Sequence, residues 1–492
     1  MPLPGSRRES EVTASPDGTG GPLVLSGSAG SLVATDVMFA QIELLQGLQG
    51  DVTAWQGRLD RIRQLDRQPA PGWGAHDAGP ALLSAATQLH GLLEECRGLS
   101  DRLMTAAEAY ARTEAQAAWL LRQAGAVQAW LLGLFLPAVV AGVTPPLVLG
   151  ALGILVGAWA TGRDPAQLPA AVTRWIGEHP ELLTNPLIVA VVRVVVDSAD
   201  DFAGGRLGVP LGASLGLGGD GLGLFGAATS AAGVLAVAQP VDLLTDSPVT
   251  VRPAPASDPR PAPPRTIAAL AQRIPESVAQ TPQVRIERYG PADAPSWVVY
   301  IGGTVDWNLS GSTDPWDMAS NVAAVARQDG ASLRAVLDAM RQAGIGPQDP
   351  VVEVGHSQGG AIATQVAESG LFRSVLVATF GAPSAGGRPV STPTVAVEHL
   401  DDIVPATGGT SRPSPARVTV RREAFQGRSL PHDVTLPAHA MTEYQRTAAL
   451  IDASADPQLR ALAATLSGTV GAETGTATRW IARRTPASDT AR

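Results

Sequence analysis

The sequence predicts an α/β fold, with a mostly parallel sheet and helices on both faces, preceded by an all-α helical hairpin and an apolar helical region. Short β-branched runs alternate with amphipathic segments from about residue 284 to residue 454. This alternation is typical of a parallel sheet whose strands are connected by helices. Two long heptad patterns joined by a Pro/Gly turn come earlier, and apolar, glycine-rich stretches lie between them and the alternating part.

The composition indicates more than one folding unit and excludes several functions. The chain has 492 residues, whereas single hydrophobic cores stop growing at about 250 to 300 residues. Its formal net charge of -9 argues against a nucleic-acid partner, because that role normally needs a basic surface. Cys96 is the single cysteine, which excludes an intramolecular disulfide and a thiolate metal cluster. We expect no metal and no cofactor.

The chain divides into six parts. They are a disordered N-terminus (1–30), a helical hairpin (31–125), an apolar, glycine-rich region that is helical or membrane-associated (126–245), a proline-rich linker (246–282), the α/β domain (283–455) and a mostly disordered tail (456–492). The N-terminus lacks the charged start and apolar core of a secretory signal peptide. The prolines of the linker cannot sustain a helix or a central strand. The tail loses its pattern beyond one short helix.

Two heptad patterns predict the hairpin. The first has two apolar rows, one of Met38, Leu45, Val52 and Leu59 and the other of Leu48, Trp55 and Ile62. The main row of the second consists of Leu82, Leu89, Cys96, Leu103 and Tyr110. Such spacing gives amphipathic helices, and the short turn between them folds the pair back on itself. We expect Trp55 to be a core residue of this pair.

The hairpin resembles the WXG100-type proteins, which are exported by type VII secretion. The resemblance rests on the hairpin, on Trp73-Gly74 in the turn, and on the run from Tyr110 to Glu114, which matches the family's Tyr-x-x-x-acidic export signal. The family's turn reads Trp-x-Gly, whereas here Gly74 follows Trp73 directly. The resemblance implies the type VII secretion machinery as a partner. The alternative is that Tyr110 is an ordinary heptad position followed by a solvated glutamate.

The region after the hairpin is unusually apolar. No charged residue lies between Arg122 and Arg163, and Pro145-Pro146 divides this stretch into two halves. Because a span needs about 20 apolar residues, we expect residues 123–162 to associate with a membrane as a tight hairpin. The alternative is a buried helical core. A second apolar stretch, 207–241, contains one charged residue, Asp220.

The chemistry of the chain is concentrated around residue 357. A Gly-His-Ser-Gln-Gly run occupies residues 355–359, between a predicted strand (351–354) and a predicted helix (361–369). This context is typical of a nucleophile elbow, where the glycines leave room for a strained turn that exposes a serine. We therefore predict Ser357 as the nucleophile, and the backbone amide of Gln358 as a donor to a developing oxyanion.

Candidate partners of Ser357 follow it in the chain. The carboxylates are Asp401 and Asp402, after a predicted strand, and the histidines are His399, His432 and His439. In hydrolases with this elbow the order is serine, acid, histidine, which His399 violates. We prefer His439 as the base, because it opens the last amphipathic helix, and we keep His432 as the alternative. The turn Gly302-Gly303-Thr304 offers a second oxyanion donor, Thr304.

This part of the chain resembles the fungal-lipase-like, or class 3 lipase, branch of the α/β hydrolases. Four motifs match in order, at residues 298–304, 355–363, 379–383 and 402–405. The resemblance implies an α/β hydrolase fold, and it selects Asp402 as the acid, in the run Asp-Ile-Val-Pro. His439, followed by Tyr444, fits the family's histidine. The family usually has Arg where this chain has Gly302, and Leu where it has Gln358.

We therefore expect a serine ester hydrolase, lipase- or esterase-like, which acts on acyl esters or lipids through an acyl-enzyme. Ser357, His439 and Asp402 would form its triad, with the amides of Gln358 and Thr304 as the oxyanion donors. The apolar region favours the cell membrane or envelope as its location, with the cytoplasm left open. The alternatives are a secretion-linked or membrane-anchored interaction protein with a degenerate hydrolase scaffold, and a thioesterase or amidase on the same fold.

Overall fold

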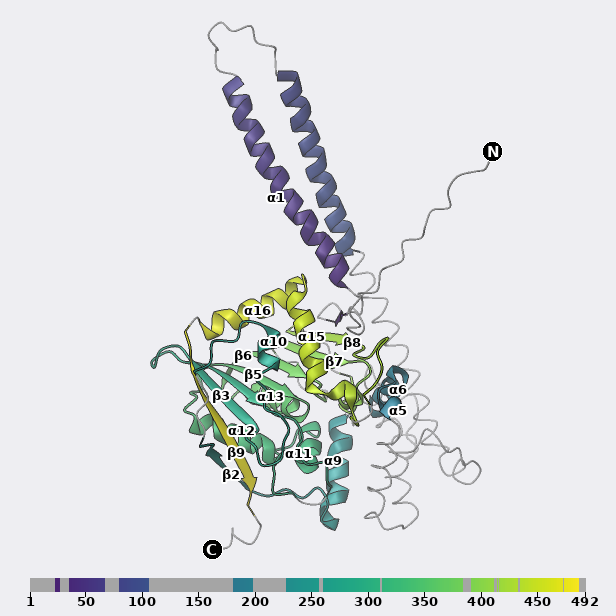
Figure 1. The fold of residues 1–492 in the computed structure, drawn as a ribbon, viewed down its shortest axis with the longest axis vertical. Helices are drawn as coiled ribbons and strands as arrows, with labels where there is room; N and C mark the ends of the chain where they lie inside the picture. The colour runs from purple at the N-terminus through teal and green to yellow at the C-terminus, as the bar shows by residue number, and fades with distance from the viewer. Residues whose placement is uncertain are drawn as a thin grey trace, which may run out of the picture.

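The computed structural model describes the sheet domain and parts of the N-terminal half (Figure 1). The described residues are 23–26, 35–66, 79–105, 180–197, 227–255, 260–309, 312–383, 391–410, 414, 416–431, 434–471 and 473–485. The stretches 123–162 and 110–114 and the Trp73-Gly74 pair lie outside them, so the expected membrane association and export signal remain predictions. In the described part of the chain, no helix is both long enough and apolar enough to cross a membrane.

The centre of the fold is a nine-stranded mixed sheet with helices on both faces, which confirms the predicted α/β architecture. Strands β4 to β8 are parallel to one another, and the outer pairings are antiparallel. In spatial order the strands are β1 (Val24–Ser26), β8 (Arg417–Arg422), β7 (Thr394–His399), β6 (Arg373–Phe380), β5 (Pro350–His356), β4 (Ser296–Ile301), β3 (Val284–Tyr289), β9 (Thr476–Arg484) and β2 (Val249–Pro253).

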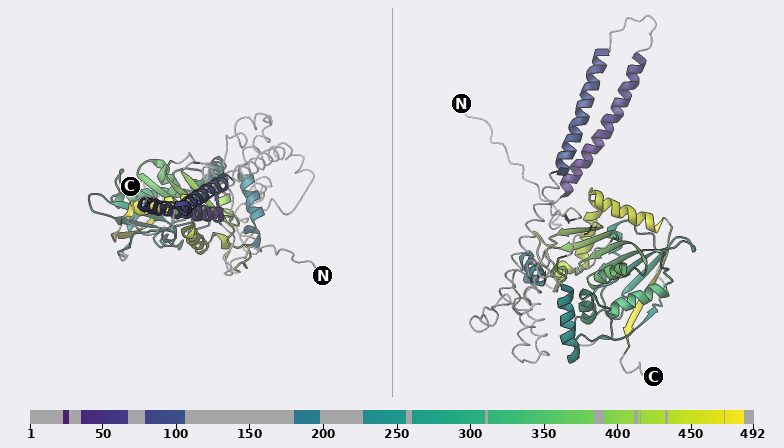
Figure 2. Two further views of the ribbon diagram at one scale, coloured as in Figure 1. Left: turned by 90° about the horizontal axis from the view of Figure 1, so that it is seen from above. Right: turned by 180° about the vertical axis from the view of Figure 1, so that it is seen from behind.

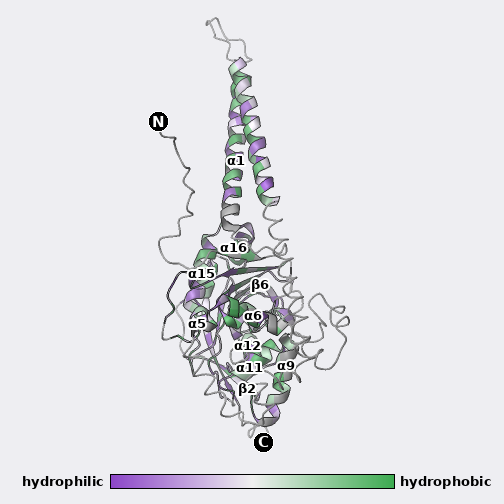
Figure 3. Cartoon of the chain, turned by 90° about the vertical axis from the view of Figure 1, so that its right-hand side faces the viewer, coloured by the Kyte–Doolittle hydropathy of each residue, from purple (hydrophilic) through white to green (hydrophobic). Residues whose placement is uncertain are grey.

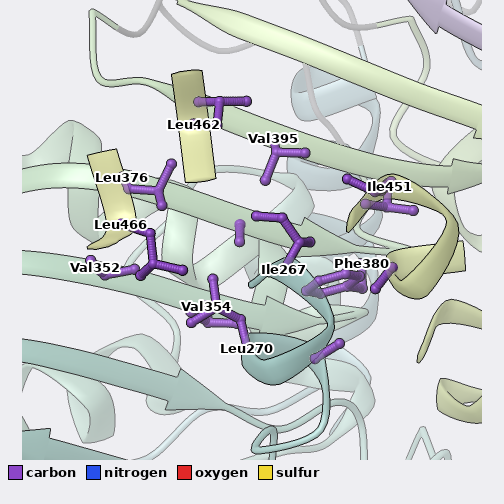
Figure 4. Close-up of a cluster of buried hydrophobic side chains, with 14 of the residues drawn as sticks. Ile267, Leu270, Val352, Val354, Leu376, Phe380, Val395, Ile451, Leu462 and Leu466 are labelled. Atoms are coloured by element: carbon purple, nitrogen blue, oxygen red, sulfur yellow. The ribbon is translucent and has the colours of Figure 1, made fainter. Parts of the chain in front are cut away.

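Helices bury both faces of the central strands. One face packs against α10 (Ile267–Ala271), α15 (Met441–Ala453) and α16 (Pro457–Val470), and Figure 4 shows Ile267 and Leu270 of α10 in the same buried cluster as Val352 and Val354 of β5. The other face packs against α12 (Ala331–Gln342) and α13 (Gln358–Ser369). Strands covered on both sides read as nearly continuous apolar runs, which is why β4 and β5 could be predicted.

Further helices border the carboxyl edge of the sheet. The helix α11 (Met318–Val325) packs against α9 (Ala227–Ala238), and α14 (Ile403–Ala406) packs against α6 (Pro186–Asp197), which follows α5 (Pro180–Leu183). Arg193 of α6 forms an ion pair with Glu398 of β7 (3.3 Å). The described helices of the expected 126–245 region therefore pack on the sheet domain.

Three stretches differ from the sequence-based expectation. The N-terminus contributes edge strand β1, in which Leu25 is buried, as is Leu23 directly before it. The expected linker contains β2 and α10, and Pro253 is tolerated there because β2 is an edge strand. The expected disordered tail forms α16 and β9, and β9 lies inside the sheet between β3 and β2. The tail is therefore part of the sheet domain.

The hairpin consists of α1 (Thr35–Asp66) and a helix over 79–105, and it projects from the sheet domain (Figure 2). Val52 is buried with Leu93 and Cys96, so one predicted row does face the partner helix. The other row is wrong as a core, because Trp55 is 57% exposed, with the Arg58 guanidinium 4.9 Å from its ring centroid. Figure 3 shows the alternating polar and apolar surface of both helices.

Glu353 places a carboxyl group in the apolar layer on the face of β5 that α13 covers. Its side chain is fully buried, Oε1 accepts a hydrogen bond from Ser374 Oγ (2.5 Å), and Oε2 has no partner among the described residues. Burial raises the pKa of Glu353 from 4.5 to about 8. The native state therefore holds a proton at neutral pH that the unfolded chain releases, and this contribution to stability is lost as pH rises from about 4.5 to about 8.

We expect Glu353→Gln to remove this pH dependence. One pKa unit corresponds to about 1.4 kcal/mol. The difference in unfolding free energy between the variant and wild type should therefore shift by a few kcal/mol in favour of the variant as the pH rises from about 5 to about 9. Urea unfolding of both proteins at several pH values measures this difference. The other titrating groups contribute equally to both proteins, so their effects cancel when the two unfolding free energies are subtracted. Parallel stability curves for the two proteins would contradict the assignment.

Candidate active site

Ser357 lies at a strained junction between β5 and α13. Its backbone has φ 54° and ψ -125°, a region that residues with a Cβ atom rarely adopt. The Ser357 amide donates to the carbonyl of Phe380 at the end of β6 (2.8 Å), and the Ser357 carbonyl accepts from the Gly360 amide (3.0 Å). The strand and the helix therefore hold the serine in this conformation.

Two glycines permit the close packing around this turn. A Cβ at Gly355 would collide with the backbone of Gly359 and Gly360, and a Cβ at Gly359 would collide with the carbonyls of Ile301 and Gly302. The amino end of α13 thus packs directly on β5 and on the end of β4. This is the steric reason for the Gly-x-Ser-x-Gly spacing.

The candidate site residues lie at one edge of the sheet. Ser357 follows β5, the turn with Thr304 follows β4, and Asp402 lies three residues after β7. Since β4, β5, β6 and β7 are parallel, these strands end at the same edge. This carboxyl edge is where substrates bind in open α/β folds.

His439 and Asp402 are hydrogen-bonded to each other. The Nδ1 atom of His439 is 2.7 Å from Oδ2 of Asp402, and His439 belongs to the short 3-10 turn Pro437–His439 that precedes α15. The other carboxylate oxygen, Oδ1, accepts from the amide of Val404 (3.0 Å) and so caps α14. Burial raises the pKa of Asp402, but His439 and the other hydrogen-bond donors outweigh burial and hold that pKa below its ordinary value. The carboxylate is therefore ionised at neutral pH and orients the imidazole.

Tyr444 is a further member of this cluster. Its hydroxyl donates to Asp402 Oδ2 (2.7 Å), the oxygen that also faces His439. The ring occupies the space where a Cβ at Gly381 would stand, and Gly381 has φ 62°. Both residues lie in motifs that were compared with those of lipases, but no role was predicted for Tyr444. Its role depends on a contact between α15 and the loop after β7.

The rejected candidates have other roles or lie outside the described residues. His399 is buried, with its ring stacked on Tyr444 (3.9 Å between centroids), and its nitrogens face Ala438 O (2.7 Å) and Thr447 Oγ1 (2.8 Å). Asp401 accepts from the backbone amides that follow β8, at residues 424 and 425. Both residues thus support the loops around the site. His432 lies outside the described residues.

His356 lies between Ser357 and the loop of His439. The His356 and His439 rings have centroids 4.7 Å apart, and His356 Nε2 is 3.0 Å from the carbonyl of His439. Burial lowers the pKa of His356 to about 3, so the imidazole is neutral and donates through Nε2 to that carbonyl. This contact places the His439 loop over the strand end that carries Ser357.

The two candidate oxyanion donors lie on either side of the elbow. A Cβ at Gly303 would lie 3.2 Å from Ser357 Cβ and 3.1 Å from His356 Nδ1, so the 302–304 turn is in contact with the nucleophile. Among the described residues, neither the Thr304 amide nor the Gln358 amide donates a backbone hydrogen bond. Gln358 is the first residue of α13, where the helix dipole favours negative charge.

Four buried polar atoms around the elbow have no hydrogen-bond partner within the described part of the chain. They are Ser357 Oγ, His439 Nε2, Thr304 Oγ1 and Gln358 Oε1. Ser357 Oγ and His439 Nε2 are therefore not bonded to each other, and catalytic hydrogen bonds are often longer in structures without substrate. Such unsatisfied buried groups are rare in proteins and typical of functional sites.

Comparison with known proteins adds no relative. Models of known protein families, curated proteins and solved structures all give no significant match to this chain. Among the described residues, no group of three or more His, Cys, Asp or Glu side chains could hold a metal ion. The geometry around Ser357 is therefore the basis of the functional proposal.

Proposed function

We propose that the chain is a serine ester hydrolase with an α/β-hydrolase fold of the class 3 lipase type. The observation that carries the proposal is the 2.7 Å hydrogen bond from His439 to an ionised, buried Asp402, beside a serine with φ 54°. A strained serine next to an oriented imidazole is the arrangement that activates a hydroxyl as a nucleophile. The open amides of Gln358 and Thr304 support the same function.

Ser357, His439 and the two oxyanion donors each have a separate role in the proposed reaction. His439 Nε2 takes the proton of Ser357 Oγ as Oγ attacks the acyl carbonyl, and the carbonyl π electrons move to the oxygen. The amides of Gln358 and Thr304 donate to that oxyanion. When the tetrahedral intermediate collapses, His439 gives its proton to the departing alcohol, and an acyl-Ser357 ester remains. Water, deprotonated by His439, then releases the acid and restores Ser357.

Asp402 and Tyr444 fix the direction of proton transfer. Asp402 accepts from His439 Nδ1, so the free Nε2 faces the reaction and accepts the proton. The charge of Asp402 stabilises the imidazolium that forms in each half-reaction. Tyr444, bonded to the same carboxylate oxygen, keeps that oxygen in place.

The proposal is tested by turnover of p-nitrophenyl esters with short and long acyl chains by the purified full-length protein. We expect hydrolysis of at least the short ester, which places the least demand on the acyl pocket. An acyl thioester and an acyl anilide measured in parallel separate an esterase from a thioesterase or amidase on the same fold. No turnover of any of the three classes would overturn the assignment as a hydrolase.

A further inference from the structure

The two candidate oxyanion donors come from different elements, so their spacing has to be fixed by a third. Thr304 follows β4, whereas Gln358 begins α13. An oxyanion hole works only when both donors are held at hydrogen-bonding distance from the same oxygen, and small displacements cost rate. The segment Trp316–Asp317, at the start of α11, contacts Gln358 and the residues that directly follow Thr304.

This segment binds the turn that carries Thr304 through the backbone. The Trp316 carbonyl accepts hydrogen bonds from the amides of Val305 (2.7 Å) and Asp306 (3.1 Å). Asp306 and Asp317 also pair as an isolated parallel β-bridge. The turn after β4 is thus attached to the amino end of α11 immediately after Thr304.

The same segment binds the side chain of Gln358. Its Nε2 donates to the Asp317 carbonyl (3.4 Å) and to Ser332 Oγ (3.3 Å), and Gln358 is fully buried. The Ser332 amide in turn donates to Ser320 Oγ (3.4 Å). Asp317 and Ser320 therefore connect Gln358 with the turn of Thr304.

Arg484, at the end of β9, binds the side chains of Asp317 and Ser320. Its Nε and Nη2 atoms donate to the two carboxylate oxygens of Asp317 (3.0 and 2.9 Å), and Nη2 also donates to Ser320 Oγ (3.0 Å). Asp317 is 2% exposed and Arg484 is 8% exposed. A bidentate pair of this kind fixes geometry as well as charge, and removal of one partner leaves a buried charge uncompensated.

We propose that Arg484 is a positioning residue for the oxyanion hole, acting through Asp317 on the Thr304 turn and on Gln358. The inference rests on the proposed function and goes beyond it, because Arg484 belongs to a strand of the C-terminal segment that does not touch the reacting atoms. Arg484 also pairs with Asp246, which lies after α9. Arg484 thus connects the C-terminal strand and the segment directly after the apolar region to the site.

The test compares Arg484→Lys and Arg484→Met with wild type in p-nitrophenyl butyrate hydrolysis. We expect kcat to fall about ten- to a hundredfold in Arg484→Met while KM changes less than about threefold, because only the transition state uses the oxyanion donors. Arg484→Lys, which keeps the charge but loses the bidentate geometry, should lie between the two. Inhibition by an alkyl boronic acid, which forms a tetrahedral adduct on serine, should weaken by the same factor as kcat.

Arg273→Met is the matched control. Arg273 is paired with buried Glu287 (2.8 Å) beside α10, on the opposite face of the sheet from α12 and α13. This variant should lose stability with kcat and boronate inhibition unchanged. If Arg484→Met shows the same pattern, a lower melting temperature with unchanged kcat and inhibition, the pair is only structural and the inference is overturned.

Gln358→Leu keeps the inference testable if the arginine variants do not fold. It removes the side-chain link to Asp317 and Ser332 and retains the backbone amide. We expect the same loss of kcat and of boronate inhibition, and unchanged values would overturn the inference. A wild-type protein that neither hydrolyses acyl substrates nor binds the boronate would instead refute the proposed function, so the two failures are distinguishable.

Discussion

Ser357→Ala is expected to hydrolyse p-nitrophenyl butyrate about 10⁶-fold more slowly than wild type, because the acyl-enzyme cannot form without the hydroxyl. The turn geometry should persist, since it is set by the Phe380 and Gly360 backbone bonds and by the glycines on either side of the serine. The loss should therefore appear in kcat, with circular dichroism and the melting transition close to those of wild type. Steady-state kinetics on both proteins measures it.

Ser369→Ala provides the control from the same helix. The Ser369 hydroxyl donates to Val366 O at the far end of α13 (2.6 Å), away from the site. Its kcat should equal that of wild type. A Ser357→Ala protein that retains activity within tenfold of wild type would place the nucleophile elsewhere in the chain.

Asp402→Asn is expected to lower kcat about 10⁴-fold, as loss of the orienting carboxylate does in serine hydrolases. An asparagine amide that donates to His439 Nδ1 leaves the proton on Nε2, so the imidazole can no longer accept the proton of Ser357. The remaining side-chain oxygen would still accept from the Val404 amide, and the Tyr444 hydroxyl, which faces the same position as His439, could accept from the new amide nitrogen, so the local packing should persist. Kinetics with the short ester, together with the melting temperature, separates a catalytic loss from unfolding.

Asp401→Asn distinguishes the two adjacent acids. The Asp401 carboxylate accepts from the backbone amides of Ala424 and Phe425 (2.9 and 2.8 Å), so its replacement should reduce stability and leave kcat within a few-fold of wild type. The opposite result, a large loss of kcat in Asp401→Asn and none in Asp402→Asn, would refute the assignment of the acid.

Much of the candidate site could be predicted because its signals are local. The glycines at 355 and 359 are required by direct backbone contacts, and a strand and a helix on either side of Ser357 are visible in the apolar pattern. Chain order excluded His399, whose buried ring bonds Thr447 instead of facing Ser357. The contact of Tyr444 with Asp402 and the proposed positioning role of Arg484 were missed, since both depend on contacts between segments more than 40 residues apart.

The parts of the fold that were mispredicted have weak local patterns. In β9, Trp480 and Arg484 are the buried residues, so the strand lacks a continuous apolar run and depends on pairing with β3 and β2. The strand β2 was assigned to the linker because it ends in Pro253, a residue that is excluded from central strands but tolerated in edge strands. In the hairpin, the heptad pattern could not tell which of two apolar rows faces the partner helix, and Trp55 belongs to the exposed one.

The most direct test of the central proposal is the position of a fluorophosphonate adduct on the full-length protein. The reagent phosphonylates a serine only when a neighbouring base and an oxyanion hole activate it. We expect a single adduct on Ser357, located by peptide mass spectrometry, and none in His439→Ala. An unmodified protein, or an adduct on a different residue, would contradict the proposal that Ser357, His439 and Asp402 form a working triad.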